Sequence, residues 1–459
     1  MKGGKLKQFS ASILCKSSRA LLRLFRRGGT ALPGKLALSL DPEILGRVSE
    51  GVETILVTGT NGKTTTCRIL EHALRKAGRE PLANRSGANL MSGITAEFVC
   101  CASVLGKARR RYAVIECDEA ALRHAAPFLK PKAIVVTNLF RDQLDRYGEV
   151  MHTLEVIREA VREVPDTTLC LNADDSLAAS LAGETRGRVL YFGLDPSCGD
   201  HGAAAVSDAR RCIFCGAEYE YGYHTFAHLG GFRCPSCGYE RPKADAAVVS
   251  IEKSAAEYSL VHMRAGKKIR SVTVGLPGLY NLYNAAAAVC AYTAAGYDPG
   301  EIMDLLGDRV GGFGRQETFV VYGRPVRMIL VKNPAGCSQT LEYLGSVGED
   351  YDLALGLNDR TADGHDISWI WDADYERLAA DLRLRTVYVF GDRARDMCLR
   401  LRYADIPAEK IVPLENMKEL PGRIRGGSRP LIILPNYTAM LALRAVLQKA
   451  AGTRDFWKG

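Results

Sequence analysis

Short apolar runs alternate with polar turns and amphipathic stretches along most of the chain, and the first clear example spans residues 52–78. Residues 55–57 form an apolar run that predicts a buried strand, and a glycine-rich turn follows it. Apolar residues then recur at helical spacing, at Ile69, Leu70, Ala73 and Leu74. The pattern therefore predicts a strand, a turn and a helix in immediate succession.

Two later apolar runs also end in polar residues. One run ends at Glu116, with Asp118 and Glu119 just beyond it, and the other covers residues 133–137, followed by Asn138 and Asp142. Ligands bind at the carboxyl ends of parallel strands, so these side chains are candidates for nucleotide or metal contacts. Each carboxylate has an alternative use as a helix cap.

The last third of the chain repeats strand and helix patterns, which predicts a parallel, doubly wound domain over residues 315–459. Strands resume earlier at 246–254. The stretch LGLNDRTADGHDISWIWDADYE (355–376) lies at the end of one C-terminal strand and holds five aspartates and two of the three tryptophans. It is either a site-forming loop with tryptophans facing a partner, or an aspartate-rich turn with tryptophans packed beneath it.

Composition places the chain among soluble globular proteins of two or three domains, with 459 residues and 47% hydrophobic content. No apolar run is long enough to cross a membrane, and basic residues interrupt any signal peptide, so we expect a cytoplasmic protein. In that compartment the fourteen cysteines favour thiols or metal ligands over disulfides.

The net charge of +9 originates at the N-terminus, because nine lysines and arginines precede the first acidic residue, Asp41. We expect residues 1–44 to form a basic amphipathic segment ahead of a central domain at 45–314. Residues 11–27 alternate apolar and basic positions. They form either a helix packed on its own domain or a helix that lies on an anionic membrane surface.

The turn after the first strand reads GTNGKTT (59–65), here called the phosphate loop, and it matches the Walker-type arrangement. Its glycines let backbone N–H groups approach phosphates, and a helix N-terminus favours the anion. Lys63 is expected to reach the β- and γ-phosphates of ATP, and the Thr64 hydroxyl to bind Mg²⁺ together with Glu116. The expected ATP contacts in the loop are Thr60, Asn61, Gly62, Lys63, Thr64 and Thr65.

Two C-x₂-C pairs separated by eighteen residues, Cys212/Cys215 and Cys234/Cys237, predict a structural Zn²⁺ site of four thiolates. Gly216 and Gly238 follow the pairs, as expected where backbone amides turn toward the sulfurs. We treat residues 203–242 as a zinc ribbon inserted in the central domain. Few basic residues lie between the pairs, which argues against nucleic-acid binding. His224 and His228 in the ribbon are interpreted as surface residues.

Residues 45–315 resemble the Mur ligases and folylpolyglutamate synthases. The resemblance is carried by GTNGKTTT, the strand-end Glu116, TNLFRDQLDRYG, LNADD (171–175) and GLYNLYNAAAA (278–288), in that order. It implies an enzyme that joins an amine to a carboxylate through an acyl phosphate made from ATP. It further implies ATP contacts from Asn138, Asn281, Asn284 and Arg315.

The chain departs from this family at two metal-related positions. Gln143 stands where the family usually has a metal-binding histidine, and Arg158 is the only basic residue near the position of a lysine that is often carbamylated. We therefore expect one Mg²⁺ rather than two.

The C-terminal domain resembles the ligase-like subunits of lipid II isoglutaminyl synthases, through KNPAG, NDRTADGHDISWIWD, NYTA and the four-cysteine ribbon. The resemblance implies amidation of the D-glutamate α-carboxylate of lipid II, with ammonia from a glutaminase partner of the GatD type in a heterodimer. It also implies that the aspartate-rich loop gives a carboxylate to the glutaminase site, with Asp366 as first choice and Asp363 as second.

Two other functions compete with this interpretation. A stand-alone ligase of the same fold would use an amino acid in place of ammonia, which the changes at Gln143 and Arg158 and the ribbon disfavour. A zinc-ribbon ATPase that binds nucleic acid would explain the net charge, but the basic residues are concentrated at the N-terminus, away from the ribbon.

Overall fold

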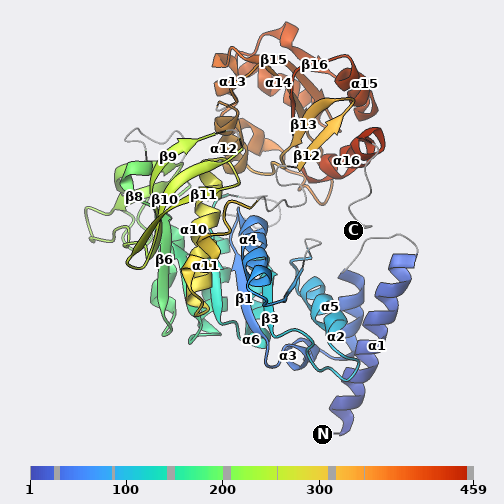
Figure 1. Cartoon of the computed structure of the whole chain (residues 1–459), viewed down its shortest axis with the longest axis vertical. Coiled ribbons are helices and arrows are strands. Elements are labelled where there is room, and N and C mark those ends of the chain that lie inside the picture. The colour runs from blue at the N-terminus through green and yellow to red at the C-terminus, as the bar shows by residue number, and fades with distance from the viewer. Residues whose placement is uncertain are drawn as a thin grey trace. The chain divides into compact units, whose positions relative to one another are not determined.

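The computed structural model describes residues 2–24, 31–84, 88–141, 150–199, 208–255, 257–308, 317–345 and 347–451. The chain divides into two compact units (Figure 1). The first comprises Met1–Phe140, Val150–Lys253 and Tyr258–Val310, and the second comprises Arg141–Glu149, Ser254–Glu257 and Gly311–Gly459. The boundary expected between residues 314 and 315 falls outside the described residues.

A nine-stranded sheet forms the centre of the first unit, in the order β11-β10-β9-β6-β5-β4-β1-β3-β2. Neighbouring strands from β2 to β9 in this order pair in parallel, and β10 and β11 pair antiparallel. The strands are β1 (Glu53–Thr58), β2 (Pro81–Ala83), β3 (Tyr112–Glu116), β4 (Ala133–Val136), β5 (Thr168–Asn172), β6 (Val189–Leu194), β9 (Ala246–Ser254), β10 (Ser259–Ala265) and β11 (Lys268–Val274).

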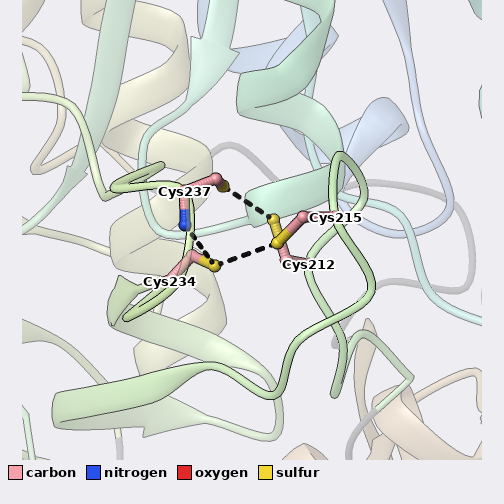
Figure 2. A group of neighbouring side chains, drawn as sticks. All are labelled: Cys212, Cys215, Cys234 and Cys237. Atoms are coloured by element: carbon pink, nitrogen blue, oxygen red, sulfur yellow. Dashed lines mark hydrogen bonds between the residues drawn. The ribbon is translucent and has the colours of Figure 1, made fainter.

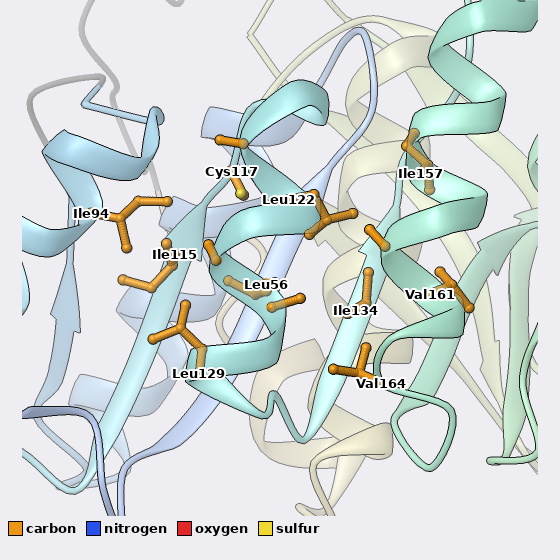
Figure 3. Close-up of a cluster of buried hydrophobic side chains, with 14 of the residues drawn as sticks. Leu56, Ile94, Ile115, Cys117, Leu122, Leu129, Ile134, Ile157, Val161 and Val164 are labelled. Atoms are coloured by element: carbon orange, nitrogen blue, oxygen red, sulfur yellow. The ribbon is translucent and has the colours of Figure 1, made fainter. Parts of the chain in front are cut away.

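Helices cover both faces of this sheet because successive strand residues point to opposite sides. On one face, Leu56, Ile115 and Ile134 of the strands pack against helices α5, α6 and α8 (Figure 3). Helices α4 and α10 pack against each other and against the sheet. The helices are α4 (Lys63–Lys76), α5 (Met91–Cys101), α6 (Glu119–Leu129), α8 (Val150–Arg162), α9 (Ser176–Ser180), α10 (Leu279–Ala294) and α11 (Pro299–Met303).

Three helices precede the sheet: α1 (Lys2–Leu24), α2 (Ala31–Leu40) and α3 (Ile44–Val48). Ala11 and Cys15 of α1 are buried in the core of the first unit, and Arg19 forms an ion pair of 2.8 Å with Glu97 of α5. The helix therefore packs on its own unit, as one of the two interpretations expects. In the described part of the chain, no helix is long and apolar enough to cross a membrane.

The expected insertion lies between β6 and β9, which are neighbours in the nine-stranded sheet. Within it, β7 (Glu220–Phe226) and β8 (Leu229–Arg233) pair as a separate antiparallel hairpin. The two cysteine pairs flank this hairpin in the sequence. The ribbon therefore leaves the sheet at one strand and returns at the adjacent one.

A six-stranded sheet, in the order β12-β13-β17-β14-β15-β16, forms the second unit. All neighbouring strands pair in parallel except β12 with β13. Its elements are β12 (Glu317–Val321), β13 (Arg324–Met328), α12 (Pro334–Leu344), β14 (Tyr351–Gly356), α13 (Glu376–Ala380), β15 (Leu384–Phe390), α14 (Ala394–Tyr403), β16 (Ile411–Pro413), α15 (Leu420–Arg425), β17 (Leu431–Pro435) and α16 (Tyr437–Ala451). Apolar clusters made from its strands and helices form the core, which confirms the expected doubly wound α/β architecture.

Candidate functional site

The phosphate loop connects β1 to α4 as the sequence predicts. Gly62 has a φ of +87°, and a Cβ atom at this position would lie 2.1 Å from Asn284 Oδ1 of α10. Only glycine accommodates both the left-handed backbone and this close approach. The missing side chain therefore lets the first turn of α10 lie against the loop, so that Gly62 and Asn284 occupy one site.

Lys63 is buried at the first position of α4. Its ammonium group donates to the carbonyl oxygens of Gly59 and Thr60 and lies 2.8 Å from Glu119 Oε1 of α6. Burial lowers the pKa of Lys63, but the charge of Glu119 and the hydrogen bond to it outweigh this effect and raise the pKa. Lys63 is therefore a fixed positive charge inside the loop.

Thr64 and Glu116, the two expected magnesium ligands, are in direct contact. The Thr64 hydroxyl donates to Glu116 Oε2 at 2.7 Å. Asn84 holds the backbone of Glu116 on both sides, because its amide nitrogen donates to the Glu116 carbonyl at 2.7 Å and its amide oxygen accepts from the Glu116 N–H at 2.9 Å. A hydroxyl and a carboxylate side by side are suitable ligands for Mg²⁺ next to phosphates.

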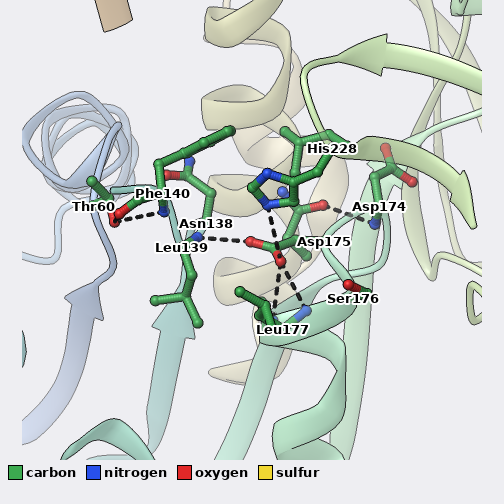
Figure 4. A network of polar contacts seen from close by, with 12 residues as sticks. Thr60, Asn138, Leu139, Phe140, Asp174, Asp175, Ser176, Leu177 and His228 are labelled. Atoms are coloured by element: carbon green, nitrogen blue, oxygen red, sulfur yellow. Dashed lines mark hydrogen bonds and ion pairs between the residues drawn. The ribbon is translucent and has the colours of Figure 1, made fainter. Parts of the chain in front are cut away.

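Asn138, at the end of β4, bonds to the phosphate loop. Its side chain accepts from the Asn61 N–H at 3.0 Å and donates to the Asn61 carbonyl at 3.2 Å. The Thr60 hydroxyl accepts from the Phe140 N–H at 3.0 Å and donates to the Phe140 carbonyl at 3.1 Å (Figure 4). The Thr60 N–H also donates to the Asn138 carbonyl at 2.8 Å, so five hydrogen bonds hold the loop and the segment 138–140 together.

Asn281 and Asn284 are buried in the first turns of α10 and bond to each other, with the Asn284 amide donating to Asn281 Oδ1 at 3.1 Å. Thr65 lies in the first turn of α4, beside Thr64. Together with Asn138, these residues bring the start of α10 and the segment after β4 to the phosphate loop at the start of α4. This is where the sequence predicts ATP to bind.

Three of the expected positions, Arg315, Asp142 and Gln143, are not among the described residues. Arg158 of α8 forms ion pairs with Glu155 at 2.5 Å and with Glu184 at 2.9 Å. Both partners are acidic, so Arg158 neutralises their charge at this place.

The four cysteines of the ribbon converge (Figure 2). All four sulfurs lie within 4.8 Å of one another, and the Cys212–Cys237 and Cys215–Cys234 sulfur pairs are 3.6 Å and 3.4 Å apart. Four sulfurs around a tetrahedral zinc at bonds of about 2.3 Å would be about 3.8 Å apart. The cluster therefore has the dimensions of a closed four-thiolate zinc site.

Backbone amides also point to the sulfurs, as a metal-binding knuckle requires. The Cys237 N–H donates to the Cys234 sulfur, and this contact, with a further one from the Ser236 N–H, lowers the pKa of Cys234 to about 6. Gly216 and Gly238 both have a φ of +77°, so the two halves of the ribbon turn in the same way. The backbone contacts favour the thiolate of Cys234, the form that binds metal, whereas desolvation and hydrogen bonds with the neighbouring cysteines outweigh a backbone hydrogen bond and raise the pKa of Cys237 to about 12.

In the second unit, the aspartate-rich loop contacts the start of α16. Both carboxylate oxygens of Asp363 interact with Thr438: one accepts from its N–H at 2.8 Å and the other bonds its hydroxyl. Asp363 is buried, and burial raises its pKa against the opposing effect of these bonds. Asp363 therefore caps α16 from a distant part of the chain.

Asp366 is half-buried on the same loop, and its Oδ1 accepts from the Ser368 N–H at 2.8 Å. The two tryptophans of the loop differ in burial: Trp369 packs against the core, whereas Trp371 is 46% exposed and contacts Tyr403 edge-to-face. The loop thus combines a packed underside with an aromatic and a carboxylate at the surface.

The sequence did not assign a role to several residues of the first unit. Among the acidic candidates after β3, the sequence does not distinguish Glu119, yet it is the carboxylate partner of Lys63. The expectation that His228 lies at the surface is wrong, because its side chain is fully buried between Asp175 and Phe140 (Figure 4). The sequence around His228 contains no signal for its burial, because the burial depends on packing against a distant part of the chain.

Two family models match the chain: "Mur ligase middle domain" at residues 57–213 and "MurT ligase C-terminal" at residues 330–440. A lipid II isoglutaminyl synthase (glutamine-hydrolyzing) subunit MurT from Streptococcus pneumoniae is 35% identical, over 94% of this chain and 95% of that protein. The chain belongs to the MurT family. A MurT subunit from Staphylococcus aureus is 30% identical over 97% of this chain and 99% of its own length.

Membership of the MurT family agrees with the fold. MurF from Acinetobacter baumannii superposes with a TM-score of 0.66 over 92% of this chain and 81% of MurF, at 16% identity. The expected family, fold class and enzyme class are therefore confirmed. The chain is an ATP-dependent ligase of the Mur type, in a family whose named members are subunits of lipid II isoglutaminyl synthase.

Proposed function

We propose that this chain is the ATP-dependent subunit of a lipid II isoglutaminyl synthase. It amidates the α-carboxylate of D-glutamate in lipid II and so produces D-isoglutamine for peptidoglycan. The main support is likeness to two MurT subunits over nearly the full length of the chain. The contacts among Lys63, Glu116 and Asn138 around one phosphate loop are consistent with this role.

The reaction uses the phosphate loop in two steps. An oxygen of the substrate carboxylate attacks the γ-phosphorus of ATP, and ADP leaves, which yields an acyl phosphate. Ammonia then attacks the acyl carbon and gives up one proton, and inorganic phosphate leaves with that proton as the amide forms. Lys63 holds a positive charge in the loop where negative charge moves between the phosphates, so it stabilises the transition state of the first step.

Thr64 and Glu116 would hold Mg²⁺, which supplies charge neutralisation at the phosphates. Their contact of 2.7 Å places a neutral and an anionic oxygen ligand together at the start of α4. Asn281 and Asn284 would contact the adenine or ribose of ATP from α10. Arg315 would approach the phosphates, as the family resemblance implies.

The ribbon cysteines would bind one Zn²⁺ in a structural role. All four positions of a tetrahedral ion are filled by protein sulfurs, so no position is left for water or substrate. The zinc would therefore stabilise the ribbon and take no part in the chemical steps.

Ammonia would come from a glutaminase partner of the GatD type, in a heterodimer. The names of the relatives, glutamine-hydrolyzing synthase subunits, support such a partner. Asp366 remains our first choice for a carboxylate lent to the partner's active site, where it would orient a histidine. The two bonds from Asp363 to Thr438 give that residue a helix-capping task, which supports the order of the two choices.

We further propose a cytoplasmic enzyme that works peripherally at the membrane, where a lipid-linked substrate resides. Helix α1 supports this location, because Leu6, Phe9 and Ile13 are exposed on the face opposite to Ala11 and Cys15. Cosedimentation with vesicles tests the idea: binding to anionic vesicles should exceed binding to neutral ones and should decrease in the Ile13→Ser variant. Equal binding to both vesicle types would refute it.

The decisive experiment for the proposed function compares three sets of substrates. ATP turnover should require lipid II with ammonium, or lipid II with glutamine and the partner. Turnover with lipid II and a free amino acid would identify a stand-alone ligase instead. Turnover stimulated by nucleic acid would identify a nucleic-acid-dependent ATPase. The Lys63→Met variant is the control in each assay.

A further inference from the structure

The hairpin of the cysteine ribbon, β7 and β8, packs against the segments that carry the nucleotide site. Its turn is Ala227 and His228, and Ala227 has a φ of +48°, which is unusual for a residue other than glycine. Such a conformation persists only where the surrounding structure imposes it. The hairpin is therefore fixed by its contacts with the rest of the first unit.

His228 makes the first of these contacts. Its side chain is 0% exposed, and its ring centre lies 4.6 Å from the ring centre of Phe140, the last residue of the 138–140 segment. Its Nε2 is 3.6 Å from Asp175 Oδ1, and neither ring nitrogen has a hydrogen-bond partner among the described residues. A buried imidazole in this state is costly, so its position calls for an explanation.

Asp175 connects His228 to the same segment by a second route. Its Oδ2 accepts from the Leu139 N–H at 2.7 Å, while its Oδ1 accepts from the N–H groups of Leu177 and Ala178 (Figure 4). The residues on both sides of Leu139 bond to the phosphate loop. His228 thus packs against residues 138–140, the same segment that bonds to the phosphate loop.

A third contact reaches α10. The hydroxyl of Tyr283, which lies between Asn281 and Asn284, donates to Asp174 Oδ2 at 2.6 Å and lies 2.5 Å from the Thr225 hydroxyl of β7. Asp174 in turn accepts from Arg241, near the end of the ribbon segment, at 2.5 Å. The ribbon hairpin therefore contacts both the 138–140 segment and the site end of α10.

We propose that contacts from the ribbon hairpin hold the nucleotide site in its binding arrangement. His228 and Tyr283 are the positioning residues, which couple metal binding by the ribbon to the affinity of the site for nucleotide. The inference rests on the proposed ATP site. Ordering of the ribbon by zinc would hold residues 138–140 and the start of α10 in the arrangement that binds nucleotide. Coupling between two sites is reciprocal, so nucleotide should also strengthen retention of the metal.

The test uses the zinc-loaded full-length protein and needs no variant in its first arm. The equilibrium distribution of zinc between the protein and a chromogenic chelator is measured with and without saturating MgADP. We expect MgADP to lower zinc transfer and so raise the apparent affinity of the protein for zinc by about fivefold or more, the lower range of coupling between distinct sites. An effect of this kind is not expected from a ribbon that only stabilises the fold.

The second arm measures MgADP affinity by calorimetry in three variants. Tyr283→Phe removes only the bridging hydroxyl, and His228→Ala removes the packed ring, so both should weaken MgADP binding by about fivefold or more. His224→Ala is the matched control, because this ring lies in the same hairpin but stacks on Tyr221 at 4.1 Å. Its affinity for MgADP should equal that of the wild type.

The outcomes separate the inference from the proposed function. Wild-type affinity in Tyr283→Phe and His228→Ala, together with zinc transfer that ignores MgADP, would overturn the inference alone. A wild-type protein that binds neither MgADP nor MgATP would overturn the nucleotide site itself, and the inference with it. Should His228→Ala fail to fold, Tyr283→Phe and the wild-type zinc assay still decide the question.

Discussion

Lys63 and Glu119 form a buried ion pair, which makes the cost of losing the lysine calculable. The two side chains are each 9% exposed, and Nζ and Oε1 are 2.8 Å apart. Lys63→Met keeps the buried stem but leaves the Glu119 carboxylate without its cation. Removal of one partner from a buried pair costs about 3–5 kcal/mol. Because Glu119 retains a little exposure, we expect a loss of about 3 kcal/mol in the free energy of unfolding.

A second change should recover most of this loss. Glu119→Gln replaces the orphaned carboxylate by a neutral amide, so the double variant should lose less than half of what Lys63→Met loses. Urea unfolding followed by circular dichroism measures the difference. All three tryptophans, at 369, 371 and 456, belong to the second unit, so tryptophan fluorescence serves as an internal control. Its midpoint should not move in either variant.

Activity should behave differently from stability. Both the single and the double variant lack the positive charge in the phosphate loop, so ATP-dependent amidation should fall by well over tenfold, or more than about 1.4 kcal/mol in the barrier. Equal unfolding free energies for the two variants would refute the buried pair. Retention of more than a tenth of wild-type turnover at saturating ATP would refute the role of Lys63 in catalysis.

Three more predictions concern the ribbon and the aspartate-rich loop. Metal analysis should find one zinc per chain, and none after serine replaces both Cys212 and Cys215; zinc retained in that variant would contradict the site. Asp366→Asn should preserve amidation with ammonium but sharply reduce amidation with glutamine and the partner; an equal loss with both would place Asp366 in the ligase site. Burial raises the pKa of Asp363, so the folded unit holds this proton more tightly than the unfolded chain, and stability falls as pH rises through the raised pKa. The Asp363→Asn variant can still cap the helix but has no carboxyl group at this position. Its free energy of unfolding should therefore fall less steeply than that of the wild type from about pH 4 upward; identical slopes for the two proteins would argue against the raised pKa.

The features that the sequence predicted are those with a local cause. The phosphate loop is encoded by seven consecutive residues between an apolar run and a helical pattern, and the cysteine site by two short spacings. The strand expected at 246–254 has those bounds in the structure. The repeated strand and helix patterns were sufficient for the doubly wound second unit, because each element there has an unambiguous period.

The features that the sequence did not predict depend on contacts between distant residues. His228 is buried because the hairpin folds back onto Phe140, which lies 88 positions earlier in the chain. Asp363 caps a helix that begins more than seventy residues later. No pattern in a single sequence encodes such pairings, so Glu119 and Asp363 were seen as acidic residues without identified partners.

The capping of α16 by Asp363 also has a consequence for association with another subunit. The loop that carries Asp366 is tied down at Asp363, at the ion pair between Arg360 and Asp392, and at the packed ring of Trp369. A loop that is already ordered gives up little conformational entropy when a protein docks on it. Recognition through this loop should therefore resemble the meeting of two rigid surfaces, with little structural change in its backbone.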